Sequence, residues 1–146
     1  MHFFALDFEA SGLDLKRSYP IEVGYTDGTM KKVFYIKPVK EWTYWNKDSE
    51  YIHKINRAFI EEYGFDVKEV CEKMNLDLQG QSVIVDGGEF DYFWLNRLYA
   101  AANIQPTFRL QSVSHPNFKS VEHRALSDAI QLWNWASEEL ATNNVR

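Results

Sequence analysis

Two carboxylates, Asp7 and Glu9, stand where an apolar stretch ends in the sequence FFALDFEASG, residues 3–12. The stretch predicts a buried strand, and alternate residues of a strand point to the same face. Asp7 and Glu9 would therefore share one face, with Phe8 on the other, and their oxygens could hold one cation together. Because many strands end in solvated acids, this pair needs further ligands from elsewhere in the chain to make a metal site.

The composition of the chain limits the classes of fold and function that it can have. The chain has 146 residues, 45% hydrophobic and 16% aromatic, which suits one domain with its own core. Its one cysteine, Cys71, has apolar neighbours and fits a core position in a reducing, cytoplasmic protein. We expect no membrane span and no export signal, because no long apolar run is present. The net charge of −5 argues against a duplex-coating protein but leaves room for a nucleic-acid enzyme with a small footprint.

The first third of the chain predicts an antiparallel meander. Strands are expected at Phe3–Glu9, Pro20–Thr26 and Met30–Ile36, and Asp27-Gly28 is typical of a hairpin turn. Residues 41–51 then hold four aromatic side chains without clean periodicity, which predicts a loop. These rings could pack against the core or stack on a nucleobase, and both interpretations stay open. The four are Trp42, Tyr44, Trp45 and Tyr51.

Helical spacing dominates the remaining two thirds. The apolar run Ser82–Val85 predicts a parallel strand covered on both faces, and Asp86-Gly87-Gly88 leads from it into a helix. The expected fold is α/β, with a mixed five-stranded sheet of three antiparallel and two parallel strands and flanking helices. One domain, 1–146, would contain it, with 141–146 as a frayed tail. The other elements are helices near 58–63, 67–74, 90–102 and 123–140 and a strand near 108–113.

This order of elements, with acids at the tip of the first strand, resembles the ribonuclease H-like architecture. Three motifs resemble the DEDDh family of 3′–5′ exonucleases. The first is the Asp-x-Glu of Asp7 and Glu9, and the second is Phe90-Asp91, which opens a helix after a buried strand. The third is a histidine five residues before an aspartate, His123 and Asp128 in HRALSDA. The motifs run in order over nearly the whole chain.

Two smaller features bear on the resemblance. Residues 52–55, Ile-His-Lys-Ile, are similar to a short histidine-containing segment that the family places before its middle helices. The chain departs from the family at Asp86-Gly87, where many members have a His-Asn pair. The contribution of that pair would be absent or made differently here. Neither feature changes the expected ligands.

The resemblance implies hydrolysis of phosphodiester bonds by two metal ions, Mg²⁺ or Mn²⁺, which hard oxygen ligands suit. Asp7, Glu9, Asp91 and Asp128 would be the ligands, because four negative charges in one pocket are costly without a cation. His123 would be the general base, since an imidazole can take a proton at neutral pH. Five residues turn a helix by about 140°, so His123 must lie at the helix start or before it.

Further assignments follow from the same resemblance. The backbone and side chains around Phe8, Ala10 and Ser11 are expected to face the terminal nucleotide. A role beside the metal ligands is conceivable for Glu22, Asp86 and Glu89, but a solvated or packing role is expected for each. His2, His53 and His115 have no comparable support for a catalytic role.

The expected function is therefore a 3′–5′ exonuclease that releases nucleoside 5′-monophosphates from a single-stranded end. No motif addresses a 2′-hydroxyl, so DNA and RNA are equally expected as substrates. Oligomeric state and pathway have no signal in the sequence. Two alternatives remain: a catalytically silent nuclease-like module that binds nucleic acid or a protein, and a metal-dependent phosphohydrolase of small nucleotides.

Overall fold

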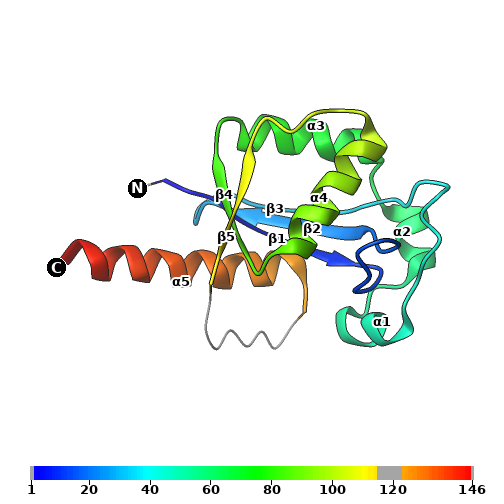
Figure 1. Cartoon of the computed structure of the whole chain (residues 1–146), viewed down its shortest axis with the longest axis horizontal. Coiled ribbons are helices and arrows are strands. Elements are labelled where there is room, and N and C mark those ends of the chain that lie inside the picture. The colour runs from blue at the N-terminus through cyan, green and yellow to red at the C-terminus, as the bar shows by residue number, and fades with distance from the viewer. Residues whose placement is uncertain (1, 115–122, 146) are drawn as a thin grey trace.

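The computed structural model describes residues 2–114 and 123–145, which form a mixed five-stranded sheet flanked by helices (Figure 1). The strand order is β3-β2-β1-β4-β5. Strand β1 pairs antiparallel with β2 and parallel with β4, so the meander joins the parallel half of the sheet through β1. The predicted α/β sheet is confirmed. The strands are β1 (Ala5–Ala10), β2 (Pro20–Thr26), β3 (Lys31–Tyr35), β4 (Ser82–Asp86) and β5 (Arg109–Val113).

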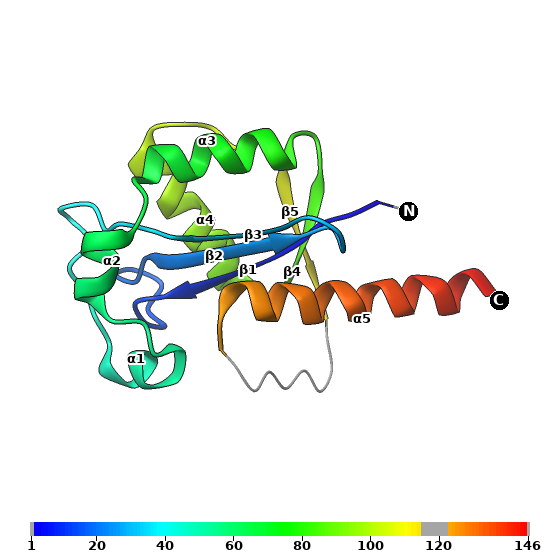
Figure 2. The same cartoon turned by 180° about the vertical axis from the view of Figure 1, so that it is seen from behind.

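Helices cover both faces of this sheet. The long helix α5 runs along one face, and α3 lies on the other side of the strands, as both views show (Figures 1 and 2). Cys71 is buried in the core between sheet and helices, as expected. None of the described helices is long and apolar enough to cross a membrane. The helices are α1 (Lys47–His53), α2 (Arg57–Tyr63), α3 (Val67–Leu78), α4 (Glu89–Ala102) and α5 (Ala125–Val145).

Two expectations about local structure were wrong. Residues 47–51, predicted as loop, belong to α1, which starts where the Asn46 side chain accepts a hydrogen bond of 2.9 Å from the Ser49 amide. Residues 141–145, predicted as a frayed tail, continue α5 to Val145. Of the aromatic segment, Trp42 is buried and stacks on Tyr19 with centroids 5.2 Å apart, which confirms packing for this ring.

Helix α5 approaches strand β2 at Gly24. A Cβ placed on Gly24 would lie 2.4 Å from the backbone nitrogen of Leu126 and 2.5 Å from its Cα. These distances are shorter than any van der Waals contact, and the atoms belong to helix backbone, which cannot rotate away. The absence of a side chain at Gly24 therefore lets the first turn of α5 lie directly on the sheet.

We expect Gly24→Ala to push this turn off β2 and to lower Tm by roughly 3–10 °C, because overpacking against backbone is relieved only by moving the helix. Thermal unfolding followed by circular dichroism measures the change. Ala101→Ser adds one heavy atom on the exposed side of α4 and serves as control. A Gly24→Ala variant with the Tm of the wild type would contradict this close contact.

Candidate active site

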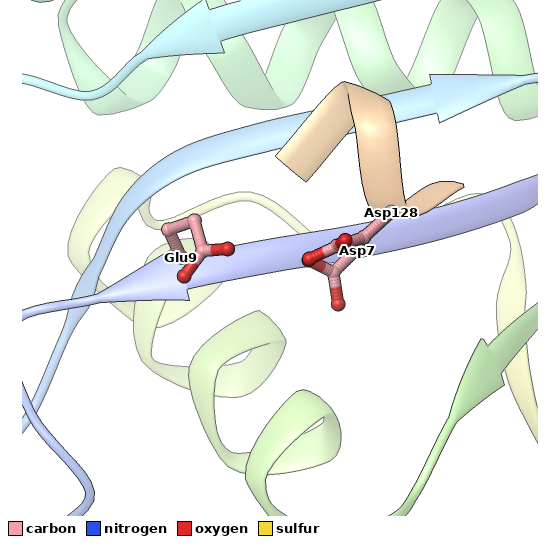
Figure 3. Close-up of side chains that lie close together, drawn as sticks. All are labelled: Asp7, Glu9 and Asp128. Carbon is pink, nitrogen blue, oxygen red and sulfur yellow. The ribbon is translucent and has the colours of Figure 1, made fainter. Parts of the chain in front are cut away.

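Three carboxylates meet at the C-terminal end of β1. One oxygen each from Asp7, Glu9 and Asp128 lies within 4.8 Å of the other two. Asp7 and Glu9 project from the same face of β1, as the alternation predicted, and Asp128 comes from the first turn of α5 beside Asp7 (Figure 3). All three side chains are half-buried. An all-oxygen set of this kind fits a hard divalent cation such as Mg²⁺ or Mn²⁺.

The fourth predicted carboxylate, Asp91, lies at the margin of this cluster. It stands in the first turn of α4 with 5% of its surface exposed. Among the described residues, it is not part of the set whose oxygens lie within 4.8 Å of one another. Burial, and then the charge of Asp86, raises the pKa of Asp91 to about 7. After burial, the charge of Asp91 is the largest cause of the raised pKa of Asp7, so the two carboxyl groups lie near enough to interact.

The pKa values show that the environment of the cluster disfavours the ionised form of its carboxylates. Burial, followed by the charge of Asp128, raises the pKa of Glu9 from 4.5 to about 9, and the two side chains share a hydrogen bond. Burial, followed by the charges of Asp91 and Glu9, raises the pKa of Asp7 well above its usual range. In the metal-free protein at neutral pH, bound protons therefore neutralise carboxylates of the cluster, as a cation could.

The predicted base, His123, is exposed and lies two residues before α5 begins, outside the helix as its spacing from Asp128 required. It lines a cavity of about 220 Å³ next to the carboxylates, together with Glu9. The remaining lining is largely apolar. It consists of Ala10, Gly12, Leu13, Ser49, Ile52, His53 and Trp94.

The residues expected to face a nucleotide divide into two groups. Ala10 lines the cavity beside Glu9. The side chains of Phe8 and Ser11 are buried in this structure, and their expected contact with a nucleotide stays a prediction. Phe8 points to the opposite face of β1 and packs against Trp94, while the Ser11 hydroxyl accepts a hydrogen bond of 3.1 Å from the Tyr19 amide. Their backbone remains a candidate for substrate contact.

His53 is a cavity residue to which sequence reasoning gave no role. It is buried, and its Nδ1 accepts a hydrogen bond of 2.9 Å from the Ile55 amide. Burial lowers the pKa of His53, so the ring is neutral and carries its proton on Nε2. The similarity of residues 52–55 to a family segment was the signal that could have found it. His2 instead pairs with Asp27 at 2.8 Å, and His115 lies outside the described residues.

The three acids expected to be solvated or packed differ from one another in burial. Glu89 is exposed, as expected, and Asp86 is half-buried. Glu22 is only 1% exposed, and Arg124 donates to both of its carboxylate oxygens. Its burial follows from the position of β2, which has sheet on both edges and helices on both faces, and whose seven residues are all buried.

Comparison with known proteins places the fold. No protein-family model matches the sequence, and no curated protein matches it. Solved structures of exonuclease I are similar: a zinc-bound Escherichia coli enzyme in complex with single-stranded DNA superposes with a TM-score of 0.70 and 13% identity over 92% of this chain. The E. coli enzyme with a dT13 oligonucleotide gives 0.62 and 12% over 76%, and the Methylocaldum szegediense enzyme gives 0.60 and 16% over 76%.

This chain spans much less than half of those proteins, 39%, 27% and 27% of their respective lengths. At these identities the likeness shows the fold alone. The described elements nevertheless follow one another as the motifs required, with a mixed sheet and the acids at the tip of its central strand. The chain therefore has the ribonuclease H-like fold of exonuclease I, and the resemblance predicted from its motifs is confirmed at the level of the fold.

Proposed function

We propose that the chain is a metal-dependent 3′–5′ exonuclease of single-stranded nucleic acid. The observation that carries this proposal is the meeting of Asp7, Glu9 and Asp128 within 4.8 Å on a fold shared with exonuclease I. The proposal also includes a cytoplasmic location, for which the single buried Cys71 is consistent with a reducing compartment.

The four carboxylates would hold two metal ions in this proposal. Asp7, Glu9 and Asp128 would hold one ion. Asp91, which lies in α4 near Asp7, would be a ligand of a second ion. Bound Mg²⁺ or Mn²⁺ would supply charge neutralisation at the scissile phosphate and an acidified water. The raised pKa values of Asp7 and Glu9 support the assignment, because burial and then the neighbouring carboxylates disfavour their ionised forms, and a bound cation would offset both effects.

His123 would take the proton from the attacking water. Its exposed side chain lines the same cavity as Glu9, which supports a position for both groups beside the same bound phosphate. Because His123 precedes α5, its backbone is not fixed by the regular hydrogen bonds of a helix. It can therefore adjust toward the substrate while Asp128, one turn further on, stays fixed.

The cavity supports a nucleotide as the bound group. Its mouth carries two apolar side chains, Leu13 and Ile52, which are 72% and 52% exposed. Trp94 forms an aromatic part of the wall. Apolar surface of this kind beside a carboxylate cluster suits a sugar and base whose phosphate lies at the metal. With a net charge of −5, we expect contacts to be confined to the last few nucleotides.

Digestion of 5′-labelled single-stranded DNA and RNA with Mn²⁺ or Mg²⁺ tests the proposal. We expect stepwise shortening from the 3′ end and release of nucleoside 5′-monophosphates. Asp7→Asn should abolish the reaction, and His123→Ala should lower turnover by about 10²–10⁴-fold while Mn²⁺ binding persists, because a general base acts in the chemical step.

Other results would favour the alternatives. Binding of oligonucleotides without any cleavage would indicate a silent binding module. Hydrolysis of free nucleotides alone would indicate a small-molecule phosphohydrolase. Near-normal turnover of the His123→Ala variant would leave a metal-dependent nuclease without the assigned role of this histidine.

Metal binding should release protons and strengthen as pH rises. The pKa of Glu9, raised to about 9, means that its proton must leave when a cation binds at neutral pH. Calorimetric titration with Mn²⁺ in two buffers of different ionisation enthalpy measures the number released, and Glu9→Gln should reduce it. Affinity that is constant between pH 6 and 8, without proton release, would contradict the electrostatics of the cluster.

The raised pKa of Glu9 also makes the stability of the metal-free protein depend on pH. Between pH 4.5 and about 9, the folded protein holds the Glu9 proton more tightly than the unfolded chain does. Unfolding therefore releases protons in this range, and the stability contributed by Glu9 falls as pH rises. Tm measured in the presence of a chelator should decline accordingly, and saturating Mn²⁺ should reverse the decline.

A further inference from the structure

An ion pair between buried Glu22 and half-buried Arg124 joins strand β2 to the chain just before α5. The Glu22 carboxylate receives hydrogen bonds from two nitrogens of Arg124: Nε at 3.1 Å and 3.2 Å from its two oxygens, and Nη2 at 2.6 Å. This is a bidentate contact, which fixes orientation as well as distance. Glu22 is 1% exposed, and about a third of the Arg124 side chain is exposed.

The same carboxylate also holds the helix backbone. Oε1 of Glu22 accepts a hydrogen bond of 3.0 Å from the amide of Ala125, the first residue of α5. Amides at a helix start have no partner within the helix, so this contact ties the end of α5 to the sheet. Arg124 in addition donates to the hydroxyl of Tyr35 on β3 and lies 5.4 Å from the centre of its ring.

The attachment lies directly across from the proposed metal ligands. In the ladder between β1 and β2, Glu22 is the partner of Glu9, and Gly24 is the partner of Asp7. Glu22 anchors the start of α5, and Gly24 leaves room for the backbone of Leu126. Asp128 follows within the same helical turn. Its distance from Asp7 and Glu9 therefore depends on where β2 holds this turn.

The contact between β2 and the start of α5 is an ion pair rather than an apolar contact, and this difference bears on its role. Glu22 is the partner of Glu9 in the ladder between β1 and β2, so its carboxylate and the bound Arg124 lie beside the cluster. A further carboxylate buried beside repelling carboxylates is a poor way to gain stability, and buried ion pairs often stabilise less than apolar groups of the same size. Their directional bonds, however, define one orientation of the helix start, which a purely apolar contact does not.

We propose that Glu22 and Arg124 are positioning residues, whose ion pair sets the first turn of α5 so that Asp128 reaches the metal site and His123 reaches the cavity. The inference rests on the proposed function for its catalytic meaning. Its structural part, the fixing of the turn, belongs to the metal-free protein and can be measured there.

The test compares two double variants. Glu22→Gln/Arg124→Met removes the ion pair without leaving either charge buried, and Gln keeps an oxygen that can accept from the Ala125 amide. The control is Glu61→Gln/Arg57→Met on α2. Arg57 likewise bonds a carboxylate, at 2.7 Å from Glu61, and also donates to the hydroxyl of Tyr19. The control thus removes a similar network away from α5.

In the metal-free protein, we expect exchange of the hydrogen-bonded amides of Ala125 and Asp128 to accelerate at least tenfold in the Glu22/Arg124 variant only. We expect its Mn²⁺ affinity, measured by calorimetry, to fall about 10–100-fold, as is typical when a group that orients a ligand is lost. The single variant Glu22→Gln, which keeps Arg124, should show the same effects and replaces the double variant should that one fail to fold.

Wild-type exchange and wild-type Mn²⁺ affinity in the Glu22/Arg124 variant would overturn the inference. A lower Tm with unchanged affinity would do so too, because the pair would then be merely structural. Failure of the proposed function has a different signature, since the wild type itself would bind no Mn²⁺. The exchange rates would then decide the anchoring alone: acceleration would support it, and no change would overturn it.

Discussion

Mutual repulsion among half-buried carboxylates is the constraint on which the rest of this structure depends. Asp7, Glu9 and Asp128 hold oxygens within 4.8 Å of one another, and Asp91 adds its charge from α4. Such a cluster persists only if the backbone holds it rigidly and if protons or cations neutralise it. The sheet provides the rigidity for Asp7 and Glu9, because β1 is paired on both edges.

Asp128 reaches the cluster through a different set of forces. It is far from Asp7 in the sequence, and its place depends on how α5 lies on β2. Gly24 permits the close approach, and the Glu22 carboxylate binds both Arg124 and the Ala125 amide. Packing and a directional ion pair thus act together on one helical turn, which would explain why two residues outside the cluster influence it.

Much of the fold could be predicted from local patterns. The bounds of β2 agree with the prediction, and those of β1, β3 and β5 differ by one or two residues, because alternation and turn residues are local signals. The shared face of Asp7 and Glu9 followed from alternation alone. Their meeting with Asp128 did not, because no local pattern encodes a contact between distant segments. It was expected only through the motif that contains His123 and Asp128.

The features that sequence reasoning missed are those that depend on neighbours in space. Glu22 was expected to be solvated or packed, and its burial beside a cationic partner arises because helices cover both faces of β2. His53 gained its place in the cavity from the position of α1, which was taken for a loop. The burial of the Phe8 ring against Trp94 follows from the same alternation that joins Asp7 to Glu9.

Anomalous diffraction from crystals grown with Mn²⁺ and a nucleoside 5′-monophosphate tests the central claim most directly. We predict Mn²⁺ bound by oxygens of Asp7, Glu9 and Asp128, with the phosphate of the nucleotide on the metal and its base in the cavity beside His53. Absence of Mn²⁺ from these carboxylates at saturating concentration, or its binding elsewhere on the chain, would contradict the account.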